Sequence, residues 1–397
     1  MSETEIPLRR GWTTGACATA AAKAAFTALI TGQFPDPVEI TLPKGQRVSF
    51  SLAKEQLTET SAMAAVIKDA GDDPDVTHGA LIVVTVSIDK SSSVISFRSG
   101  NGVGTVTKIG LPIGVGEPAI NPVPREMIKN AILEVAKANG KQVGVIVEVS
   151  IPGGEEIAQK TWNPRLGIVG GLSILGTTGV VIPFSCSAWI HSIHRGIDVA
   201  RAADVPHVGA CTGSTSETAV RQKYGLPESS ILDMGDFVGG ALKYLRRHPI
   251  PRITIGGGFG KISKLGQGHL DLHSGRSQVD LGWLAKLAAG ASASDEVVDQ
   301  IYAANTAMEA LGIASQNKLH LADLVANEAR IIALDVLSRA PVAVEVLIFD
   351  LNQVNLLSKL RRVFVRLSTL QDVSLVQQQL QFPVQTAEYR GRHRQET

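Results

Sequence analysis

The sequence predicts an α/β protein of two domains, an α+β domain followed by a Rossmann-like domain. The chain has 397 residues, enough for two domains that each bury a core. Apolar stretches of strand length alternate with stretches of helix length. Glycine is frequent, with 39 residues, which favours many tight ligand-facing turns. We predict domains at residues 1–190 and 191–350, with an appended tail rich in arginine and glutamine at 351–397.

The overall composition argues against several functional classes. The formal net charge is +1 and aromatic residues make up 5% of the chain, so nothing favours a nucleic acid partner. Cys17, Cys186 and Cys211 are far apart and have no metal-ligand spacing with histidine, so we expect no structural zinc site. The first residues lack the apolar segment of a signal peptide, and we therefore expect a cytoplasmic protein.

The first half begins with an alanine-rich stretch, residues 13–32, that predicts a helix. Thr14 is the candidate N-cap and Gly32 the expected stop. The amino end of this helix offers Thr13, Thr14 and free backbone N–H groups to an anion, although a well-capped core helix explains the same residues. Further along we predict strands at 38–42, 47–52, 80–88, 94–97 and 143–149, a short helix at 62–68 and a longer one at 126–139.

Four aspartates crowd a predicted loop at residues 68–79, which reads KDAGDDPDVTHG. Like charges this close raise some carboxyl pKa values, so one group could act as a base. Binding of a hard cation is a second interpretation, although the spacing does not match a calcium loop. A solvated acidic turn is the third. On the first interpretation the candidate catalytic residues are Asp72, Asp73, Asp75 and His78, and Lys68 lies beside them.

Two further segments of the first half combine backbone constraint with a basic side chain. Gly100, Gly102 and Gly104 precede Lys108, but no helix is expected directly after them, so they are not a dinucleotide fingerprint. A proline-rich segment then brings Arg125 to the start of the following helix. There the guanidinium suits bidentate carboxylate binding, or equally a structural salt bridge.

The stretch at residues 163–183 reads NPRLGIVGGLSILGTTGVVIP and holds five glycines but a single charge, Arg165. Such a segment can present backbone N–H groups to an anion, and Thr177 and Thr178 add hydroxyl groups. A buried, glycine-kinked core segment is the alternative. Residues 166–190 carry no charge, yet polar residues, glycine and proline interrupt them too often for a membrane helix, and we expect none.

The second half contains two units of strand, glycine-containing loop and helix, which is the form of a Rossmann-like ligand turn. The first unit is the strand at 205–211 with the loop at 212–217. The second is the strand at 252–256 followed by GGGFGK, which lacks the P-loop form. For His269 and His273 we prefer a substrate or structural role to a metal site. We also predict strands at 231–234 and 342–349 and helices at 216–224, 236–247, 285–289, 295–311 and 319–338.

Six motifs taken together resemble the CbiD family, the cobalt-precorrin-5B (C-1)-methyltransferases of anaerobic cobalamin biosynthesis. They occur in the family's order and cover roughly residues 8–350. One departure is HLDLH, where the family would show a Phe-Asn-Thr-His-like run, which leaves His273 as the comparable histidine. The tail after about Lys359 has no counterpart. The motifs are GWTTGACATAAAKAA from Gly11, KDAGDDPDVTHG from Lys68, GEPAINPVPR from Gly116, NPRLGIVGGLSILGTTG from Asn163, DMGDFVG from Asp233 and GGFGKISKLGQGHLDLHS from Gly257.

The resemblance implies methyl transfer from S-adenosylmethionine to ring carbon C-1 of cobalt-precorrin-5B, an anionic tetrapyrrole, giving cobalt-precorrin-6A. It also implies that the protein has no metal of its own, because the cobalt belongs to the substrate. A homo-oligomer is compatible with the sequence. We expect substrate contacts from Thr13, Thr14, Lys68, Lys108, Arg125, Asn163, Arg165, Thr177, Thr178 and His273, and cofactor contacts from Gly209, Thr212, Gly213, Glu217, Asp236, Gly257, Gly258, Gly260 and Lys261.

Two other functions fit parts of the sequence. A phosphoryl-transfer enzyme would use the GxGxG and GGGFGK loops on a nucleotide with magnesium, but the chain shows no proper P-loop motif. A non-catalytic tetrapyrrole carrier would bind the cobalt compound without affinity for S-adenosylmethionine. The two strand–loop–helix units favour a second ligand, and hence an enzyme.

Overall fold

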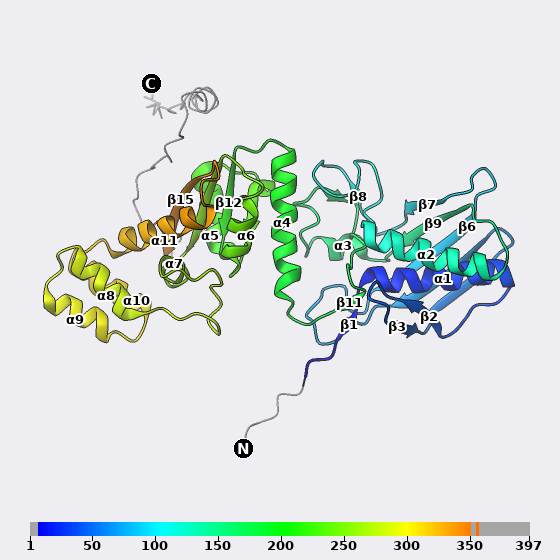
Figure 1. The fold of residues 1–397 in the computed structure, drawn as a ribbon, viewed down its shortest axis with the longest axis horizontal. Coiled ribbons are helices and arrows are strands. Elements are labelled where there is room, and N and C mark those ends of the chain that lie inside the picture. Colours follow the sequence, from blue (N-terminus) through cyan, green and yellow to red (C-terminus); the bar gives the residue numbers. More distant parts are fainter. Residues whose placement is uncertain (1–6, 351–354, 357–397) are drawn as a thin grey trace, which may run out of the picture.

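The computed structural model describes residues 7–350 and 355–356, so nearly all of the predicted tail lies outside the described residues. The protein is a mixed α/β structure with a five-stranded sheet in each half of the chain (Figure 1). Two hydrophobic clusters fill the halves, one drawn from residues between Ala16 and Ile174 and one from residues between Ile193 and Ile348. The predicted boundary near residue 190 falls inside helix α4 (Cys186–Ala202), and the division into domains stays a prediction.

Helix α1 (Thr14–Thr31) occupies the centre of the first half. It packs against the sheet, against a hairpin and against α2 (Pro122–Ala138). Its alanines are fully buried, and their small side chains let the helix lie close to all of these elements. The sheet has the order β4 (Lys54–Leu57), β5 (Ser61–Ile67), β6 (Leu81–Ile88), β9 (Val145–Ser150), β7 (Ile95–Ser99), antiparallel except between β9 and β7, and the hairpin is β2 (Val38–Thr41) with β3 (Arg47–Phe50).

Three predictions for the first half are wrong. The helix predicted at 62–68 is replaced by strand β5, because pairing with both β4 and β6 outweighs the helix propensity of its alanines. The N-cap of α1 is Thr13 rather than Thr14, since Thr13 Oγ1 accepts a hydrogen bond from the Ala16 N–H at 3.2 Å. Helix α2 begins already at Pro122, because proline is tolerated in the first turn, where no N–H is needed. The hairpin and the stop at Gly32 are confirmed.

The second half is built on a parallel sheet with helices on both faces. Helix α5 (Ser214–Tyr224) covers one face, and α4, α6 (Val238–Leu245), α7 (Phe259–Gly266) and α11 (Leu321–Leu337) cover the other. From β12 the chain passes to a strand on one side and then to a strand on the other, so the strand order reverses beside β12. The order is β13 (Ile231–Asp233), β12 (His207–Cys211), β14 (Arg252–Gly258), β15 (Ala343–Asp350), with β16 (Asn355–Leu356) antiparallel at the edge.

Two helical assignments in the second half differ from the prediction. Helix α4 was missed, although Ser185 caps it and Ile193 and Ile197 recur at helical spacing on its buried face. The predicted helix at 295–311 is two helices, because Thr306 caps a new one. The remaining elements are α8 (Leu281–Gly290), α9 (Asp295–Ala303), α10 (Ala307–Gln316), α3 (Gly154–Ala158), a 3-10 turn (Glu228–Ser230), and two strand pairs, β1 (Gly11–Trp12) with β11 (Val180–Val181) and β8 (Thr105–Val106) with β10 (Ile168–Val169).

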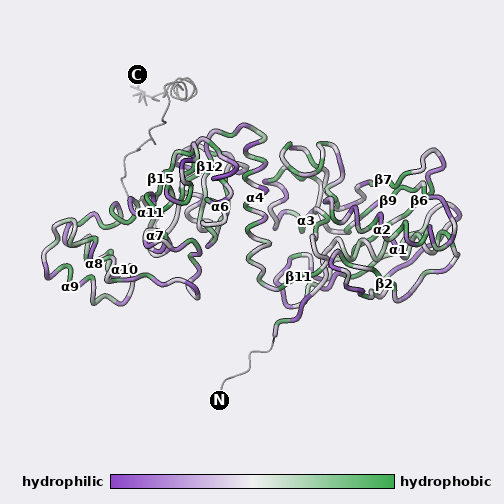
Figure 2. The backbone as a smooth tube through the Cα atoms, in the orientation of Figure 1, coloured by the Kyte–Doolittle hydropathy of each residue, from purple (hydrophilic) through white to green (hydrophobic). Residues whose placement is uncertain are grey.

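Hydrophobic and hydrophilic residues alternate along the chain in both halves (Figure 2). Among the described residues, no helix combines the length and the apolar character that a membrane crossing needs.

Candidate active site

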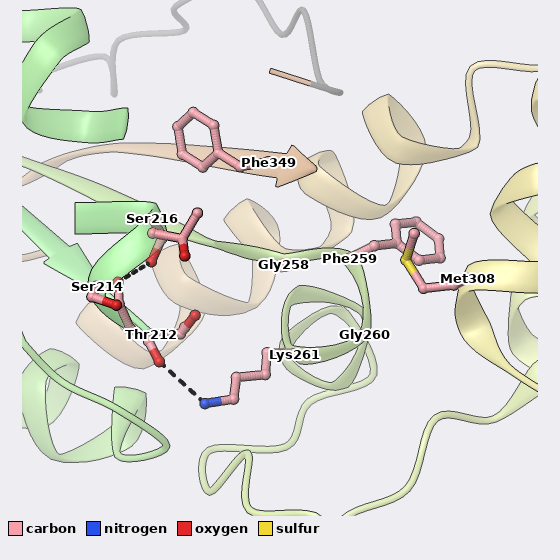
Figure 3. A pocket seen from close by; sticks show the side chains of 11 residues that line it. Thr212, Ser214, Ser216, Gly258, Phe259, Gly260, Lys261, Met308 and Phe349 are labelled. Atoms are coloured by element: carbon pink, nitrogen blue, oxygen red, sulfur yellow. Dashed lines mark hydrogen bonds between the residues drawn. The ribbon is translucent and has the colours of Figure 1, made fainter. Parts of the chain in front are cut away.

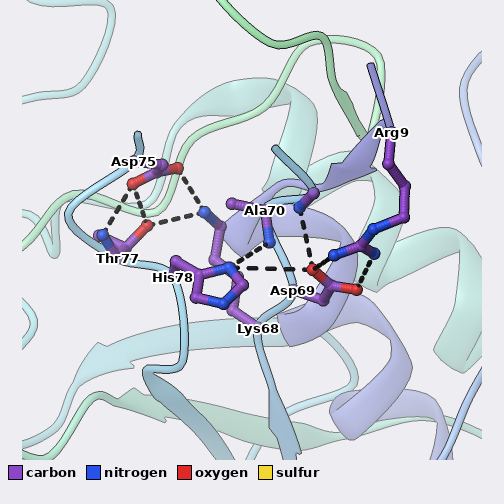
Figure 4. A network of polar contacts seen from close by, with 8 residues as sticks. Arg9, Lys68, Asp69, Ala70, Asp75, Thr77 and His78 are labelled. Carbon is purple, nitrogen blue, oxygen red and sulfur yellow. Dashed lines mark hydrogen bonds and ion pairs between the residues drawn. The ribbon is translucent and has the colours of Figure 1, made fainter. Parts of the chain in front are cut away.

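The loop at residues 68–79 is held by a buried ammonium group (Figure 4). Lys68 is 1% exposed, and its Nζ forms an ion pair with Asp75 and donates to Thr77 Oγ1 at 2.8 Å. The other oxygen of Asp75 accepts from the backbone N–H and the hydroxyl of Thr77, at 2.8 and 2.6 Å. Burial alone would raise the pKa of Asp75, but the Lys68 charge and these hydrogen bonds outweigh it, and the pKa is lowered.

A second carboxylate in this loop, Asp69, forms an ion pair with Arg9 and accepts from the Gly71 N–H at 2.9 Å. The Arg9 hydrogen bond lowers the pKa of Asp69 to about 2. His78 Nδ1 accepts from the Ala70 N–H at 3.1 Å and lies 3.8 Å from Asp69 Oδ1. The pKa values of Asp69 and Asp75 are therefore shifted opposite to the direction that crowding of like charges would give.

Asp72 and Asp73 hold other parts of the chain in place. Asp72 Oδ2 accepts from the Arg9 N–H at 2.6 Å. Asp73 Oδ1 accepts from the Phe184 N–H at 2.8 Å, across 111 positions of sequence. Each of these two carboxylates thus has a backbone partner. The catalytic role expected for Asp72, Asp73, Asp75 and His78 stays a prediction.

The glycine-rich stretch at 163–183 lies against the amino end of α1. A Cβ added to Gly176 would come within 2.2 Å of Thr13 Oγ1, so glycine permits this close approach. The Thr13 N–H donates to the Gly179 carbonyl and the Gly15 N–H to the Leu175 carbonyl, each at 3.0 Å. Thr13 and Thr14 are buried beneath this stretch. Thr177 is exposed, and the Thr178 hydroxyl donates to the Val180 carbonyl at 3.1 Å.

The predicted anion-binding arginines are engaged within the protein. Arg125 donates to the carbonyl groups of Ile120 and Pro118 at 2.8 and 2.9 Å and to Glu117 at 3.1 Å. Arg165 reaches from the first half to the second, where it holds Glu217 with two hydrogen bonds of 3.1 and 2.9 Å and Glu228 with one of 3.1 Å.

Two other predicted substrate residues also pack inside the first half. Asn163 donates to the Gly171 carbonyl and accepts from the Ser173 hydroxyl, each at 3.2 Å. The stem of Lys108 lies against Gly167. The substrate contacts expected from these residues stay predictions.

A cavity of about 480 Å³ opens at the point where the strand order of the second sheet reverses (Figure 3). The N-termini of α5 and α7 both line it, so the free N–H groups of two first turns face one space. A Cβ added to Gly213 or Gly260 would meet nothing within 4 Å. The lining residues are Thr212, Gly213, Ser214, Thr215, Ser216, Gly258, Phe259, Gly260, Lys261, Met308 and Phe349.

The structure divides the predicted cofactor residues into two groups. Thr212, Gly213, Gly258, Gly260 and Lys261 line the cavity. The remaining four residues lie outside the lining, two of them as glycines packed behind it and two as carboxylates in ion pairs. A Cβ on Gly209 would approach Val220, and one on Gly257 would approach Ile262 and Thr212, each within 2.9 Å, while Glu217 pairs with Arg165 and Asp236 with Lys261 at 3.0 Å.

Asp233, at the carboxyl end of β13, was not among the predicted site residues. Its Cα pairs with that of Cys211, directly before Thr212 of the cavity lining. Burial, followed by the charge of Glu217, raises the pKa of Asp233. One signal was present in the sequence, because Asp233 follows Gly213 by 20 residues and an acidic residue near that separation often binds a ribose hydroxyl.

The segment after α7 returns along α6. The Leu272 N–H donates to the Asp236 carbonyl at 2.8 Å, and the Gly239 N–H to the Leu270 carbonyl at 2.9 Å. His273 is exposed, and its Nδ1 accepts from the Gly275 N–H at 3.1 Å. Its predicted role with the substrate stays a prediction.

The chain matches known proteins over most of its length. It matches the family model described as CbiD over residues 1–183 and that described as CbiD, C-terminal domain, over residues 271–358. A protein of Brucella anthropi named cobalt-precorrin-5B C(1)-methyltransferase is 60% identical, over 88% of this chain and 95% of that protein. A Bradyrhizobium protein of the same name is 59% identical, over 87% and 92%.

A solved structure also matches this chain. It is described as the cobalamin biosynthesis protein (cbiD) of Archaeoglobus fulgidus and is 24% identical, with a TM-score of 0.36, over 79% of this chain and 85% of that one. The two family models and the curated relatives together cover both halves of the sequence. The chain therefore belongs to the CbiD family.

Proposed function

We propose that this protein transfers a methyl group from S-adenosylmethionine to ring carbon C-1 of cobalt-precorrin-5B, giving cobalt-precorrin-6A, in cobalamin biosynthesis. The names of the relatives at 60% and 59% identity support the reaction. The structural observation that supports it best is the cavity of about 480 Å³ at the reversal of strand order, where open α/β sheets bind small molecules. We take the second half as a Rossmann-like cofactor domain and residues 1–190 as a separate substrate domain.

The cavity residues fit an amino-acid nucleoside. The amino ends of α5 and α7 would receive the carboxylate of S-adenosylmethionine, because the partial positive charge of two first turns meets there. Gly213 and Gly260 leave space that any larger residue would fill. Asp233 would accept from the ribose hydroxyl groups. When bound, S-adenosylmethionine would supply an electrophilic methyl group on a sulfonium.

The chain's own contribution is alignment and electrostatics. Holding two reactants in the correct relative position is worth up to about 7–11 kcal/mol of a barrier. Asp233 pairs across the sheet with Cys211, the neighbour of the lining residue Thr212, and its carboxylate would favour a cationic sulfonium bound nearby. Lys261 is held by the Thr212 carbonyl at 3.1 Å and by Asp236 at 3.0 Å, which fixes the first turn of α7. A cytoplasmic location remains an expectation from the sequence.

The test is mass spectrometry of the tetrapyrrole after incubation of the purified protein with cobalt-precorrin-5B and S-adenosylmethionine. We expect one added methyl group, absent when the cofactor is omitted. Calorimetry with S-adenosylmethionine alone should show binding at one site. Tetrapyrrole binding without methylation or cofactor affinity would instead favour a carrier.

A further inference from the structure

Phe184 adopts a backbone conformation that residues with a side chain rarely adopt. Its φ is 55°, in the left-handed region that favours glycine. The residue is 67% exposed, so burial of its ring does not compensate for the strain. The hydrogen bond from its N–H to Asp73 Oδ1 holds this conformation at 2.8 Å. Strain of this kind collects at functional sites, and here it keeps an aromatic ring in solvent.

Trp189, in the first turns of α4, is also an aromatic residue that is held in place while it remains exposed. Its indole N–H donates to the Asp233 carbonyl at 3.1 Å, and its ring lies against Gly235, where an added Cβ would be 3.5 Å from Cζ2. These contacts fix the indole, yet the residue is 44% exposed. Ile182, 51% exposed, lies two positions before Phe184. We call Ile182, Phe184 and Trp189 the α4 platform.

Two hydrogen bonds connect the α4 platform to the surroundings of both candidate sites. At one end Asp73 of the Asp-rich loop binds Phe184. At the other end Trp189 donates to the Asp233 carbonyl, and Asp233 pairs with Cys211, the residue directly before Thr212 of the cavity lining. Asp73 and Asp233 thus contact two residues of one short segment, where the chain passes from β11 into α4 (Figure 1).

A positively charged side chain, that of Arg276, lies beside the α4 platform. Arg276 donates to Cys186 Sγ at 3.2 Å, in the first turn of α4, and forms an ion pair with Asp271. Its side chain is still 49% exposed, which leaves donors for a second acceptor. Asp73, the carboxylate that touches Phe184, already accepts a backbone N–H. The surroundings therefore suit a flat apolar ring that carries a negative group at its edge.

We propose that the α4 platform is where a flat, carboxylated tetrapyrrole stacks, with one peripheral carboxylate at Arg276 and its reacting edge toward the cavity. This inference rests on the proposed function and names the substrate's place within it. Phe184 and Trp189 supply faces and edges that pack on a conjugated ring. Asp73 is a positioning residue in this arrangement, because it acts on the substrate through Phe184.

The test is Phe184→Gly, measured by quenching of tryptophan fluorescence as cobalt-precorrin-5B is added. Glycine relieves the backbone strain at φ 55°, so the midpoint of urea unfolding should stay the same or rise. The dissociation constant for the tetrapyrrole should nevertheless rise roughly tenfold, as expected for loss of one aromatic contact. Affinity for S-adenosylmethionine alone should not change. In turnover, KM for the tetrapyrrole should rise more than kcat falls.

Two further variants separate this role from general effects. Tyr302→Ala removes an aromatic that is 68% exposed on α9 and should change neither constant. Trp189→Phe should lose most of the quenching, since four tryptophans are present and only this one would touch the ring. Unchanged tetrapyrrole affinity in Phe184→Gly would overturn the inference. So would a change of oligomeric state with unchanged affinity, which would make the platform a contact between copies. Neither result bears on methylation by the wild type, which tests the proposed function separately.

Discussion

The Asp-rich loop and the rim of the cavity look alike in sequence and differ in structure. Both are glycine-containing loops with charged side chains. In the loop, Lys68 pairs with Asp75, Arg9 with Asp69, and backbone N–H groups occupy Asp72 and Asp73. At the cavity, Gly213 and Gly260 face open space and two helix N-termini converge. A high density of polar residues therefore identifies a binding site less well than an open cavity whose hydrogen-bonding groups are not already paired within the protein.

The largest expected effect is a loss of stability when the buried ion pair of the Asp-rich loop is broken. Lys68→Met leaves the half-buried Asp75 without its cation, and we expect a loss of about 3 kcal/mol in the free energy of unfolding. Urea denaturation followed by circular dichroism measures this, and adding Asp75→Asn should restore part of the loss. A Lys68→Met protein of normal stability with lost turnover would make the loop catalytic rather than structural.

The second largest effect is expected on the affinity of the cavity for S-adenosylmethionine. Gly260→Leu places a side chain in open space inside the first turn of α7, so the fold should tolerate it while the cavity fills. We expect the dissociation constant for S-adenosylmethionine to rise at least about a hundredfold, or roughly 2.7 kcal/mol. Calorimetry measures it. Gly312→Leu on α10 also enters open space and is the matched control, with unchanged affinity.

Asp233→Asn should weaken S-adenosylmethionine binding about tenfold, because an amide accepts more weakly than a carboxylate. The raised pKa of Asp233 also fixes a direction with pH. Because the pKa of Asp233 is raised in the folded state, ionisation of its carboxyl group destabilises the fold, and this cost is fully present above the folded-state pKa. Asp233→Asn should therefore not destabilise the protein at neutral pH. Cofactor affinity of the wild type should fall as the pH drops through the raised pKa. Parallel pH profiles of wild type and variant would remove Asp233 from the site.

The smallest effect is expected at the rim of the loop. Asp69→Asn breaks an exposed ion pair with Arg9 and should cost less than about 1 kcal/mol. Because the pKa of Asp69 is lowered to about 2, its stabilisation is present above the ordinary carboxyl pKa and is lost as the pH falls through about 2. The difference in urea unfolding between the two proteins should be present at pH 7 and much smaller at pH 2. A loss of several kcal/mol would show that Arg9 organises the whole loop.

Local patterns predicted much of the fold. Alternating apolar residues predict the hairpin, and short apolar runs predict β6 and the strands of the parallel sheet, because both patterns are visible in the chain itself. The alanines of β5 favour a helix, whereas pairing with the strands on both sides decides its conformation.

The candidate site was predicted only in part. The cavity loops could be predicted, since a strand, a glycine turn and a helix follow one another directly. The partners of the charged residues could not. Arg165 and Glu217 are 52 positions apart, and Asp73 and Phe184 are 111 apart. Spacing along the chain does not show which charge is already satisfied by a distant segment.

Helix α4 connects the cores of the two halves of the molecule. It has 17 residues, so it is a rod of about 25 Å. Its early turns carry Trp189, and Ile193 and Ile197 lock it into the core of the second half. The first half packs on the same helix, because Val199 of α4 lies in a hydrophobic cluster with Val106 and Leu166. Arg165 also holds Glu217 across the two halves. Helix α4 is therefore a packing surface that both halves share, and a substitution that loosens it is expected to destabilise both of them at once.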